Sequence, residues 1–141
     1  MPTKNILLCD KILIEMYKNF HQSWQDIPIF VRTYELYKTF YEYLPSFPRK
    51  DRYTLGQKCE AVLLGTLEAI ITASNLTKQE KLPVLRQAST KLDVLKVLFK
   101  LGKDIKVIDN KKYTELENKT SEIGKMLGGW QGQTIRQNSP T

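Results

Sequence analysis

Four lysines occur at steps of four, three and three residues in the segment DVLKVLFKLGKDIK, which spans residues 93–106. Side chains three and four positions apart are neighbours on an α-helix, so this spacing predicts a row of amines along one flank. A row of ammonium groups can bind a polyanion, because each phosphate that it neutralises releases condensed counterions. The candidate binding residues of this flank are Lys96, Lys100, Lys103 and Lys106.

A second basic group follows Pro48 in the segment FPRKDRY and consists of Arg49, Lys50 and Arg52. The net charge of the whole chain is +7, and it is unevenly distributed. Residues 78–112 hold ten basic and four acidic residues, a net charge of +6. Such an excess favours a nucleic acid or an acidic protein as the partner. Because no element for reading bases is recognisable, we expect any nucleic acid to be bound through its charge and shape.

Residues that could perform catalysis or hold a metal are scarce. His21 is the only histidine, so a nucleophile with a histidine base beside it is not indicated. No Glu-x-x-His pair is present to build a di-metal site inside a helical bundle. Cys9 and Cys59 are too far apart for a metal site made of close ligand pairs, and we expect Cys59 in the core. We therefore predict a binding protein with no catalytic residue, no metal and no cofactor.

The chain is 141 residues long, which is enough for one domain with a core of its own. Its 41% hydrophobic and 26% charged residues are typical of globular proteins. A membrane span would need a run of about 18 apolar residues, and the sequence contains none. Asp10, Lys11 and Glu15 interrupt the apolar residues near the start, so a signal peptide is not indicated. We expect a cytoplasmic protein without membrane contact.

The apolar residues recur at steps of three and four, which is typical of helices, and no segment alternates with period two over any length. Four helices are predicted, at residues 27–43, 54–73, 83–107 and 111–127. Their short links favour an all-α fold, an antiparallel up-down-up-down four-helix bundle. We expect the bundle to occupy residues 27–130. Residues 1–26 form an N-terminal extension to which we assign no structure, and residues 131–141 a polar, disordered tail.

Local signals predict where several of these helices begin and end. Thr54 and Gln57 match the reciprocal capping pattern at the start of the second helix. Thr77 can cap a turn that leads into the third helix. Gly128 and Gly129 predict the end of the fourth helix, since paired glycines commonly follow a last helical turn.

Two further features have two interpretations each. Gly102 lies inside the third helix, at a cost of about 1 kcal/mol relative to alanine. Close approach by a neighbouring helix would explain this glycine, and so would drift. The first helix is rich in tyrosine, and some of these side chains either face a partner subunit or extend their hydroxyls into water. They are Tyr34, Tyr37, Tyr41 and Tyr43.

Three separated segments resemble one known family. FPRKDRYTLGQKCE resembles the Phe-Pro-basic-x-Arg-aromatic-Thr-Leu-Gly-Gln signature of the accessory variability determinant of diversity-generating retroelements. LDVLKVLFKLGKDIKVI is similar to the third helix of that family, and SEIGKMLGGW is similar to its closing Glu-Ile-Gly-basic-Met-Leu-Gly-Gly-Trp. The similarity covers about residues 27–130 and includes no counterpart of residues 1–26.

This resemblance implies a small basic bundle that assembles as a ring-like homopentamer. It implies binding to the reverse transcriptase of the element and to its template RNA and cDNA, in support of mutagenic cDNA synthesis. The arginines of the third helix in the family correspond to Lys96 and Lys100, and its basic loop residues to Arg49, Lys50 and Arg52. Lysine keeps the charge of arginine but not its bidentate fork, so contacts to phosphate would be purely electrostatic.

Two other functions compete with this one. The same superfamily includes four-helix proteins encoded in ribosomal-RNA intervening sequences, which would bind RNA without a polymerase partner. The other is a scaffold whose sole partner is itself, with the lysines as a solvated helix edge, as on many bundles. Salt-sensitive binding of RNA, and binding of a reverse transcriptase, separate the three.

Overall fold

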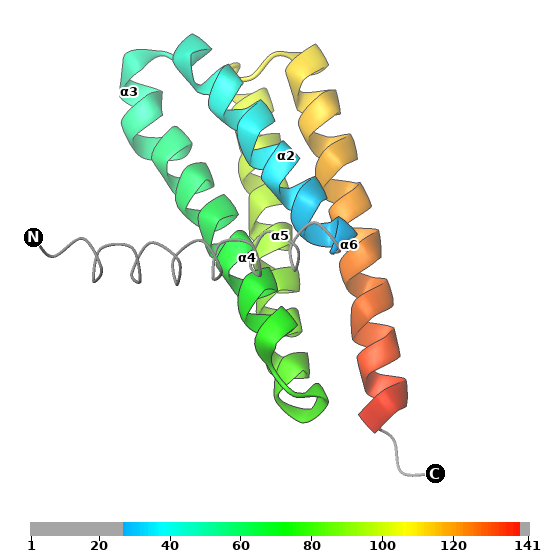
Figure 1. Ribbon diagram of the computed structural model, residues 1–141. Helices are drawn as coiled ribbons and strands as arrows, with labels where there is room; N and C mark the ends of the chain where they lie inside the picture. Colours follow the sequence, from blue (N-terminus) through cyan, green and yellow to red (C-terminus); the bar gives the residue numbers. More distant parts are fainter. Residues whose placement is uncertain (1–26, 139–141) are drawn as a thin grey trace, which may run out of the picture.

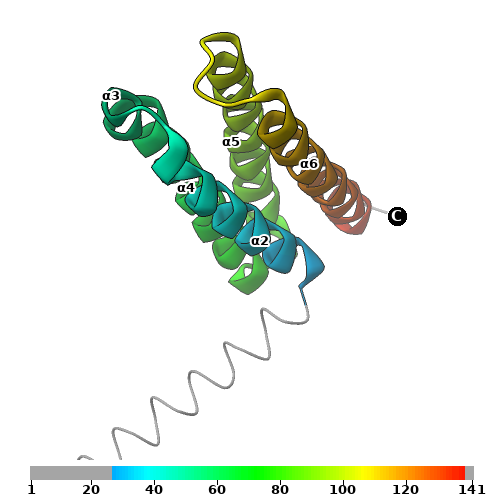
Figure 2. The same cartoon turned by 90° about the horizontal axis from the view of Figure 1, so that it is seen from above.

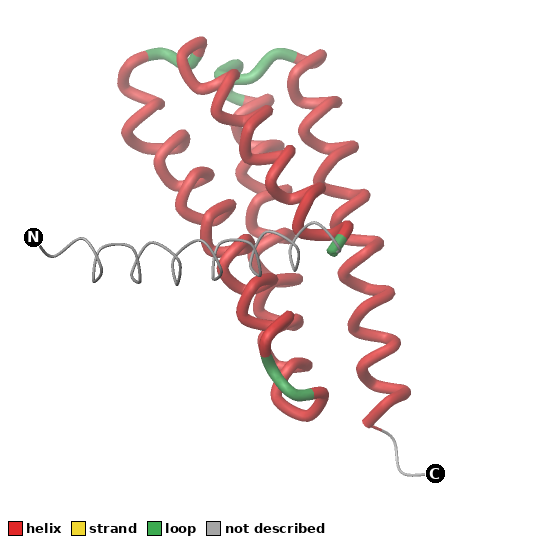
Figure 3. The backbone as a smooth tube through the Cα atoms, viewed as in Figure 1, coloured by secondary structure: helices red, strands yellow, loops and turns green. Residues whose placement is uncertain are grey.

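A computed structural model describes residues 27–138, and every regular element in that range is helical. The expectations for residues 1–26, including those for His21 and Cys9, lie outside the described residues, as do residues 139–141. Four long helices make up most of the fold, and Figure 3 shows how little of the described chain is loop. These are α2 (Pro28–Tyr43), α4 (Gln57–Asn75), α5 (Lys78–Asp104) and α6 (Asn110–Asn138).

The four long helices pack around a common core. α2 and α5 do not pack on each other as neighbours: each packs against both α4 and α6, so that these two lie between them (Figures 1 and 2). The segment between α2 and α4 and the link between α5 and α6 lie at one end of the molecule, and the α4–α5 turn lies at the other (Figure 1). Residues far apart in the sequence therefore meet at the first of these ends. The expected all-helical fold is confirmed for residues 27–138.

Aromatic and aliphatic side chains from all four helices fill the core. Phe40 of α2 lies 5.9 Å from Phe99 of α5, measured between ring centroids, and meets Phe47 edge to face at 5.8 Å. Cys59 is fully buried, as predicted, and burial raises the pKa of its thiol to about 12. The two aromatic contacts join the proline-bounded segment after α2 to the last turns of α5.

The starts of α2 and α5 agree with the sequence signals. α2 begins at Pro28, where a missing amide hydrogen costs nothing. The hydroxyl of Thr77 accepts a hydrogen bond from the amide of Glu80 at 3.4 Å, so this residue caps α5 as predicted. α5 nevertheless begins at Lys78 and includes Pro83 in its first two turns, earlier than expected.

The predicted start of the second long helix at Thr54 is wrong. The chain is already helical from Arg49, through α3 (Arg49–Asp51) and a π-helical turn, η2 (Arg52–Gly56), which runs directly into α4. The hydroxyl of Thr54 donates to the carbonyl of Lys50 at 3.0 Å rather than accepting from the amide of Gln57. Pro48 is the last extended residue before this helical stretch, which therefore begins one residue after it.

The predicted end of α6 at Gly128 and Gly129 is also wrong. Both glycines lie within α6, which continues to Asn138, so residues 131–138 are helical and not a disordered tail. Contacts with α5 explain the continuation. The side chain of Gln131 donates to the carbonyl of Leu85 at 3.0 Å, and that of Asn138 donates to the carbonyl of Lys78 at 2.8 Å. These bonds hold the last turns of α6 against the first half of α5.

Candidate nucleic-acid interface

Three of the four lysines of the predicted flank lie on the side of α5 that faces α6. The ammonium group of Lys103 is 4.8 Å from the ring centroid of Tyr113, near the start of α6. A methyl group added at Gly124 of α6 would lie 3.9 Å from Nζ of Lys96. Lys100 lies between them in the sequence at helical spacing, so the flank follows the α5–α6 groove.

Lys100 is the one lysine of this flank with an ion pair. Its Nζ lies 2.9 Å from Oδ1 of Asp104, one helical turn further along. The hydrogen bond to Asp104, and then the attraction of its charge, raise the pKa of the Lys100 amine. Both side chains are more than half exposed, and an ion pair in that setting contributes little to stability. Lys100 can therefore exchange its carboxylate partner for a phosphate at small cost.

Lys106 does not lie on the flank, and the prediction that the helix reaches Val107 is wrong. α5 ends at Asp104, and Lys106 has a φ of 64°, in the left-handed region that glycine adopts most easily. The amide of Val107 donates to the carbonyl of Gly102 at 2.8 Å, and that of Lys106 to the carbonyl of Lys103 at 3.0 Å. This pair of bonds is a Schellman motif with lysine in the place of glycine.

Gly102 allows the chain to turn back after α5. A Cβ atom at this position would lie 2.7 Å from Cδ1 of Ile108 and 3.3 Å from Cδ2 of Leu55. Ile108 belongs to the α5–α6 link and is 2% exposed, so it packs against the bare backbone of Gly102. Close approach is observed at this glycine, but the nearest side chain belongs to the α5–α6 link and not to a neighbouring helix as expected.

The basic residues after Pro48 have different roles. The guanidinium of Arg52 donates to the carbonyl of Pro45 at 2.7 Å through Nη2, and to that of Phe47 at 3.0 Å through Nε. Arg52 therefore holds the proline-bounded turn in shape. Arg49 and Lys50 are exposed on α3. Of the three candidates in this segment, these two are the ones available to a partner.

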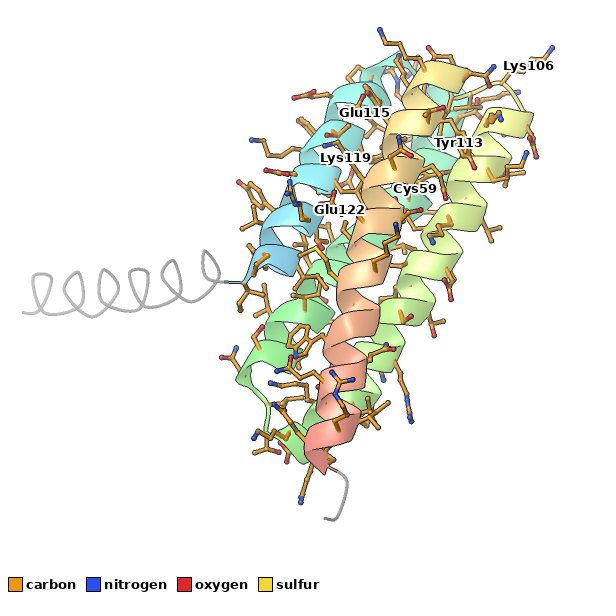
Figure 4. All side chains as sticks on the ribbon, turned by 90° about the vertical axis from the view of Figure 1, so that its right-hand side faces the viewer. Cys59, Lys106, Tyr113, Glu115, Lys119 and Glu122 are labelled. Atoms are coloured by element: carbon orange, nitrogen blue, oxygen red, sulfur yellow. The ribbon has the colours of Figure 1, made fainter. Side chains whose placement is uncertain are left out.

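A hollow at this end of the bundle brings together residues that the sequence analysis left apart. Its volume is about 630 Å³, and its walls come from Ser46, the end of α5, the α5–α6 link and the first turn of α6. Ser46 belongs to η1 (Leu44–Ser46), a short 3₁₀ helix. Nζ of Lys112 donates to the hydroxyl of Ser46 at 3.0 Å. Figure 4 shows Lys106 projecting from this end of the molecule. The lining lysines are Lys103, Lys106 and Lys112.

The sequence analysis did not single out Lys112 or Ser46. Lys112 lies within the basic segment 78–112, so the charge count already contained a signal for it. Ser46 carried no such signal, because its position beside Lys112 depends on the packing of η1 against the start of α6. No spacing rule for a single helix relates two residues that are 66 positions apart.

Two carboxylates of α6 lie on the side of this helix that faces α2. Tyr113 faces α5, whereas Glu115 and Glu122 lie on the side toward α2 (Figure 4). Glu122 pairs with Nε of Arg32 at 3.2 Å. The hydroxyl of Tyr43 donates to Glu115, and this hydrogen bond raises the pKa of the phenol to about 12. The carboxylates of the α2–α6 side thus have partners of their own and do not neutralise the lysine flank.

Residues 27–138 lack two further kinds of feature. In that range, no helix is long and apolar enough to cross a lipid bilayer. The same residues contain no cluster of three histidine, cysteine or carboxylate side chains arranged to hold a metal ion. The lysine amines described above can donate hydrogen bonds to an anion.

The fold and the surface define a class: a small, basic, all-helical protein with rows of lysines along one groove and at one end. Residues 29–134 match the family described as bAvd-like. The chain belongs to this family, whose members are accessory, non-catalytic proteins, and the resemblance to the accessory variability determinants is confirmed. No curated protein matches the chain.

Proposed function

We propose that this protein is a non-catalytic accessory subunit of a diversity-generating retroelement. In this proposal it binds the reverse transcriptase and its template RNA in the cytoplasm and supports mutagenic cDNA synthesis. The family match supports the accessory role. The observation that carries the RNA contact is the α5 flank, where Lys96 and Lys103 face the α5–α6 groove while Glu115 and Glu122 of α6 pair on the α2 side.

The contact with RNA is electrostatic in this proposal. The guanidinium of Arg49 and the amine of Lys50 are exposed on α3 and supply further positive charge in this proposal. Lysine amines neutralise phosphates without the fixed geometry of a guanidinium, so the surface accepts RNA of many sequences.

An oligomer of antiparallel bundles is the proposed form. The α4–α5 link has only two residues, Leu76 and Thr77, which favours opposite directions for the helices that it joins. The outer face of α5 also carries an apolar row, with Val97 66% and Leu101 46% exposed, continued by Val94 and Ile105. Association would remove this row from water. We therefore propose that the family expectation of a homopentameric ring applies, with this row in the subunit contact.

The α5 flank is tested by replacing Lys96, Lys100 and Lys103 with alanine. About three fewer phosphate contacts would reduce the slope of log K against log salt for single-stranded RNA by about 2, and affinity at low salt by tenfold or more. The measurement is fluorescence anisotropy over a series of salt concentrations. The matched control removes the same charge elsewhere, with Lys38, Lys78 and Lys119 changed to alanine.

Equal binding by the flank variant and its control would remove α5 from the RNA contact. Co-purification with the reverse transcriptase of the same element tests the other partner. Binding of RNA with no binding of the polymerase would instead favour the ribosomal-RNA-associated function. An oligomer that ignores RNA at low salt would favour the scaffold.

The subunit contact is tested by Val97→Glu and Leu101→Glu. Because both side chains are exposed in the single chain, the charges should dissociate the oligomer without unfolding the bundle. Mass measured by light scattering should fall to that of one chain. Leu64, 42% exposed on α4, provides a control substitution to glutamate. Unchanged mass in the α5 variants would place the subunit contact elsewhere.

A further inference from the structure

We infer that the hollow at the end of the bundle binds phosphate, and that Lys106 occupies its strained position because its amine contacts that phosphate. The ligand is a backbone phosphate of the bound RNA, so the inference rests on the proposed function and deepens it. The site adds a second point of contact to the α5 flank, and it is formed by parts of the chain that only the fold brings together.

Convergence of amines is the first observation. Lys103 comes from the last turn of α5, Lys106 from the link and Lys112 from the first turn of α6, and all three line one hollow. The hydroxyl of Ser46 lies in the same wall. This hydroxyl already donates its one hydrogen to the carbonyl of Tyr43 at 2.6 Å, so the ammonium groups are the donors for phosphate oxygens.

The state of the charges in the hollow is the second observation. Both of its carboxylates have hydrogen-bond partners: Asp104 pairs with Lys100 at 2.9 Å, and Oδ1 of Asp109 accepts the amide of Lys112 at 2.8 Å as the cap of α6. Ion pairs within residues 27–138 involve Arg32 and Lys100 and none of the three lining lysines. The positive charge of the hollow is therefore not cancelled by a salt bridge.

Two of the amines are positioned by aromatic rings. The ammonium of Lys103 lies 4.8 Å from the centroid of Tyr113, and that of Lys112 lies 5.3 Å from the centroid of Tyr43. A ring face attracts a cation without neutralising it. Lys103 and Lys112 thus have fewer arrangements to lose when a phosphate arrives, which favours binding.

The conformation of Lys106 is the third observation. Glycine best adopts the left-handed conformation that a Schellman motif requires after the helix. This chain has a lysine at that position, with a φ of 64°. Strain of this kind persists where the side chain has another use. A simpler interpretation is attraction between the amine and the carboxyl end of α5, which needs no ligand. The two interpretations predict opposite effects of removing the amine on stability and on binding.

Lys106→Gly separates them, because it removes the amine and relieves the strained backbone at once. We expect the melting temperature to rise by about 4 °C, whereas affinity for single-stranded RNA at low salt falls by about fivefold. Lys106→Asn, which also tolerates the left-handed conformation, should lose affinity to the same extent. Lys111→Gln is the matched control: this exposed lysine lies outside the hollow, and its loss should change affinity by less than about twofold.

The result that overturns the inference is RNA affinity in Lys106→Gly that equals that of Lys111→Gln. The proposed function would survive that result as long as the unaltered protein binds RNA. Failure of the unaltered protein to bind RNA at low salt would instead remove the proposed function itself. The two failures are therefore distinguishable in one series of titrations.

Inorganic phosphate distinguishes the source of the ligand. In the full chain, titration followed by amide chemical shifts should move residues 103–112 in the unaltered protein and leave them unmoved in Lys106→Gly. The same titration should compete with RNA. Phosphate binding at these amides combined with undiminished RNA affinity of Lys106→Gly would assign the hollow to free phosphate and overturn the RNA contact. Shifts confined to other segments would overturn the site.

Discussion

A lysine stands after α5 at a position that favours glycine, whereas two glycines stand inside α6 at positions that favour other residues. α6 continues as a helix through Gly128 and Gly129, although glycine is a poor helix former. α5 ends at Asp104, and Lys106 takes the left-handed conformation that glycine would adopt without strain. In both segments the position of the helix end follows from contacts with other parts of the chain. Residue preference alone would have placed each end differently.

The contacts differ in kind. α6 is held by side chains that reach across to α5, among them Gln131 and Asn138. Thr134, between them, is 2% exposed, so burial also continues beyond the glycines. α5 ends because the chain must turn back to bury Ile108 against Gly102. Burial of a side chain of this size is worth about 2 kcal/mol, which exceeds the cost of one lysine in the left-handed region.

The largest expected effect is that of Ile108→Ala. Loss of this fully buried side chain should reduce the free energy of unfolding by about 3 kcal/mol, because it leaves a cavity against Gly102. Urea denaturation measures the change. Ile105→Ala is the control in the same link: its side chain is 51% exposed, and its truncation should change the free energy of unfolding by less than about 0.5 kcal/mol. Equal effects of the two variants would show that burial of Ile108 does not end α5.

Substitution of both Gly128 and Gly129 by alanine should increase the free energy of unfolding by about 2 kcal/mol. Nothing lies within 4 Å of a Cβ atom at either position, so alanine contributes its helix propensity, about 1 kcal/mol each, without a clash. Thermal or urea unfolding followed by circular dichroism provides the measurement. A loss of stability would mean that these glycines serve a break in α6 after all.

Gly102→Ala should have the opposite sign and a smaller size. The added methyl group would overlap with Ile108 and Leu55 at a cost of 1–3 kcal/mol by the usual range for overpacked cores, roughly half of which the gain in helix propensity offsets. We expect a net loss of about 1 kcal/mol by urea denaturation. In an Ile108→Ala background the same substitution should become neutral or favourable, since the methyl group then has room. The same loss in both backgrounds would contradict the close approach.

The smallest effect that we expect is on the pH dependence of the free energy of unfolding. Tyr43 and Cys59 have pKa values raised from 10.0 and 9.0 to about 12. Where folding raises the pKa of a group, its contribution to the free energy of unfolding is complete below the pKa of the unfolded state. That contribution is lost as pH rises through the pKa of the folded state. Stability should therefore be level near neutral pH and fall between about pH 9 and 12. Urea denaturation at several pH values should show a shallower fall in Tyr43→Phe. An identical slope in that variant would contradict the role of its hydrogen bond with Glu115.

Much of the fold follows from local pattern. Apolar residues that recur at steps of three and four predict α2 to within one residue. The hydroxyl of Thr77 caps α5 as its sequence position indicates. The burial of Cys59 also follows from its place on an apolar helix face. Errors concentrate at helix ends such as Thr54, where the deciding hydrogen bond goes to a carbonyl four residues back. The end of a helix is hard to predict because local preferences and tertiary contacts at that point have similar free energies.

Part of the candidate site follows from pattern as well. Helical spacing places Lys96, Lys100 and Lys103 on one flank, and the structure shows which neighbour that flank faces. The structural use of Arg52 could not be foreseen, because its acceptors are backbone carbonyls of a turn whose shape depends on packing. The hydrogen bond between Lys112 and Ser46, in the segment after α2, could not be foreseen either, because it too depends on packing.

The sequence by itself determined the class of fold, the excess of positive charge in residues 78–112 and the periodic burial of the long helices. These depend on residue type and on spacing within one helix, which a single segment carries in full. Only the tertiary structure decided where α5 and α6 end, which amines converge and which carboxylates are already engaged. Those properties arise between segments distant in the chain, where burial and hydrogen bonds of one to a few kcal/mol outweigh local preferences of about 1 kcal/mol.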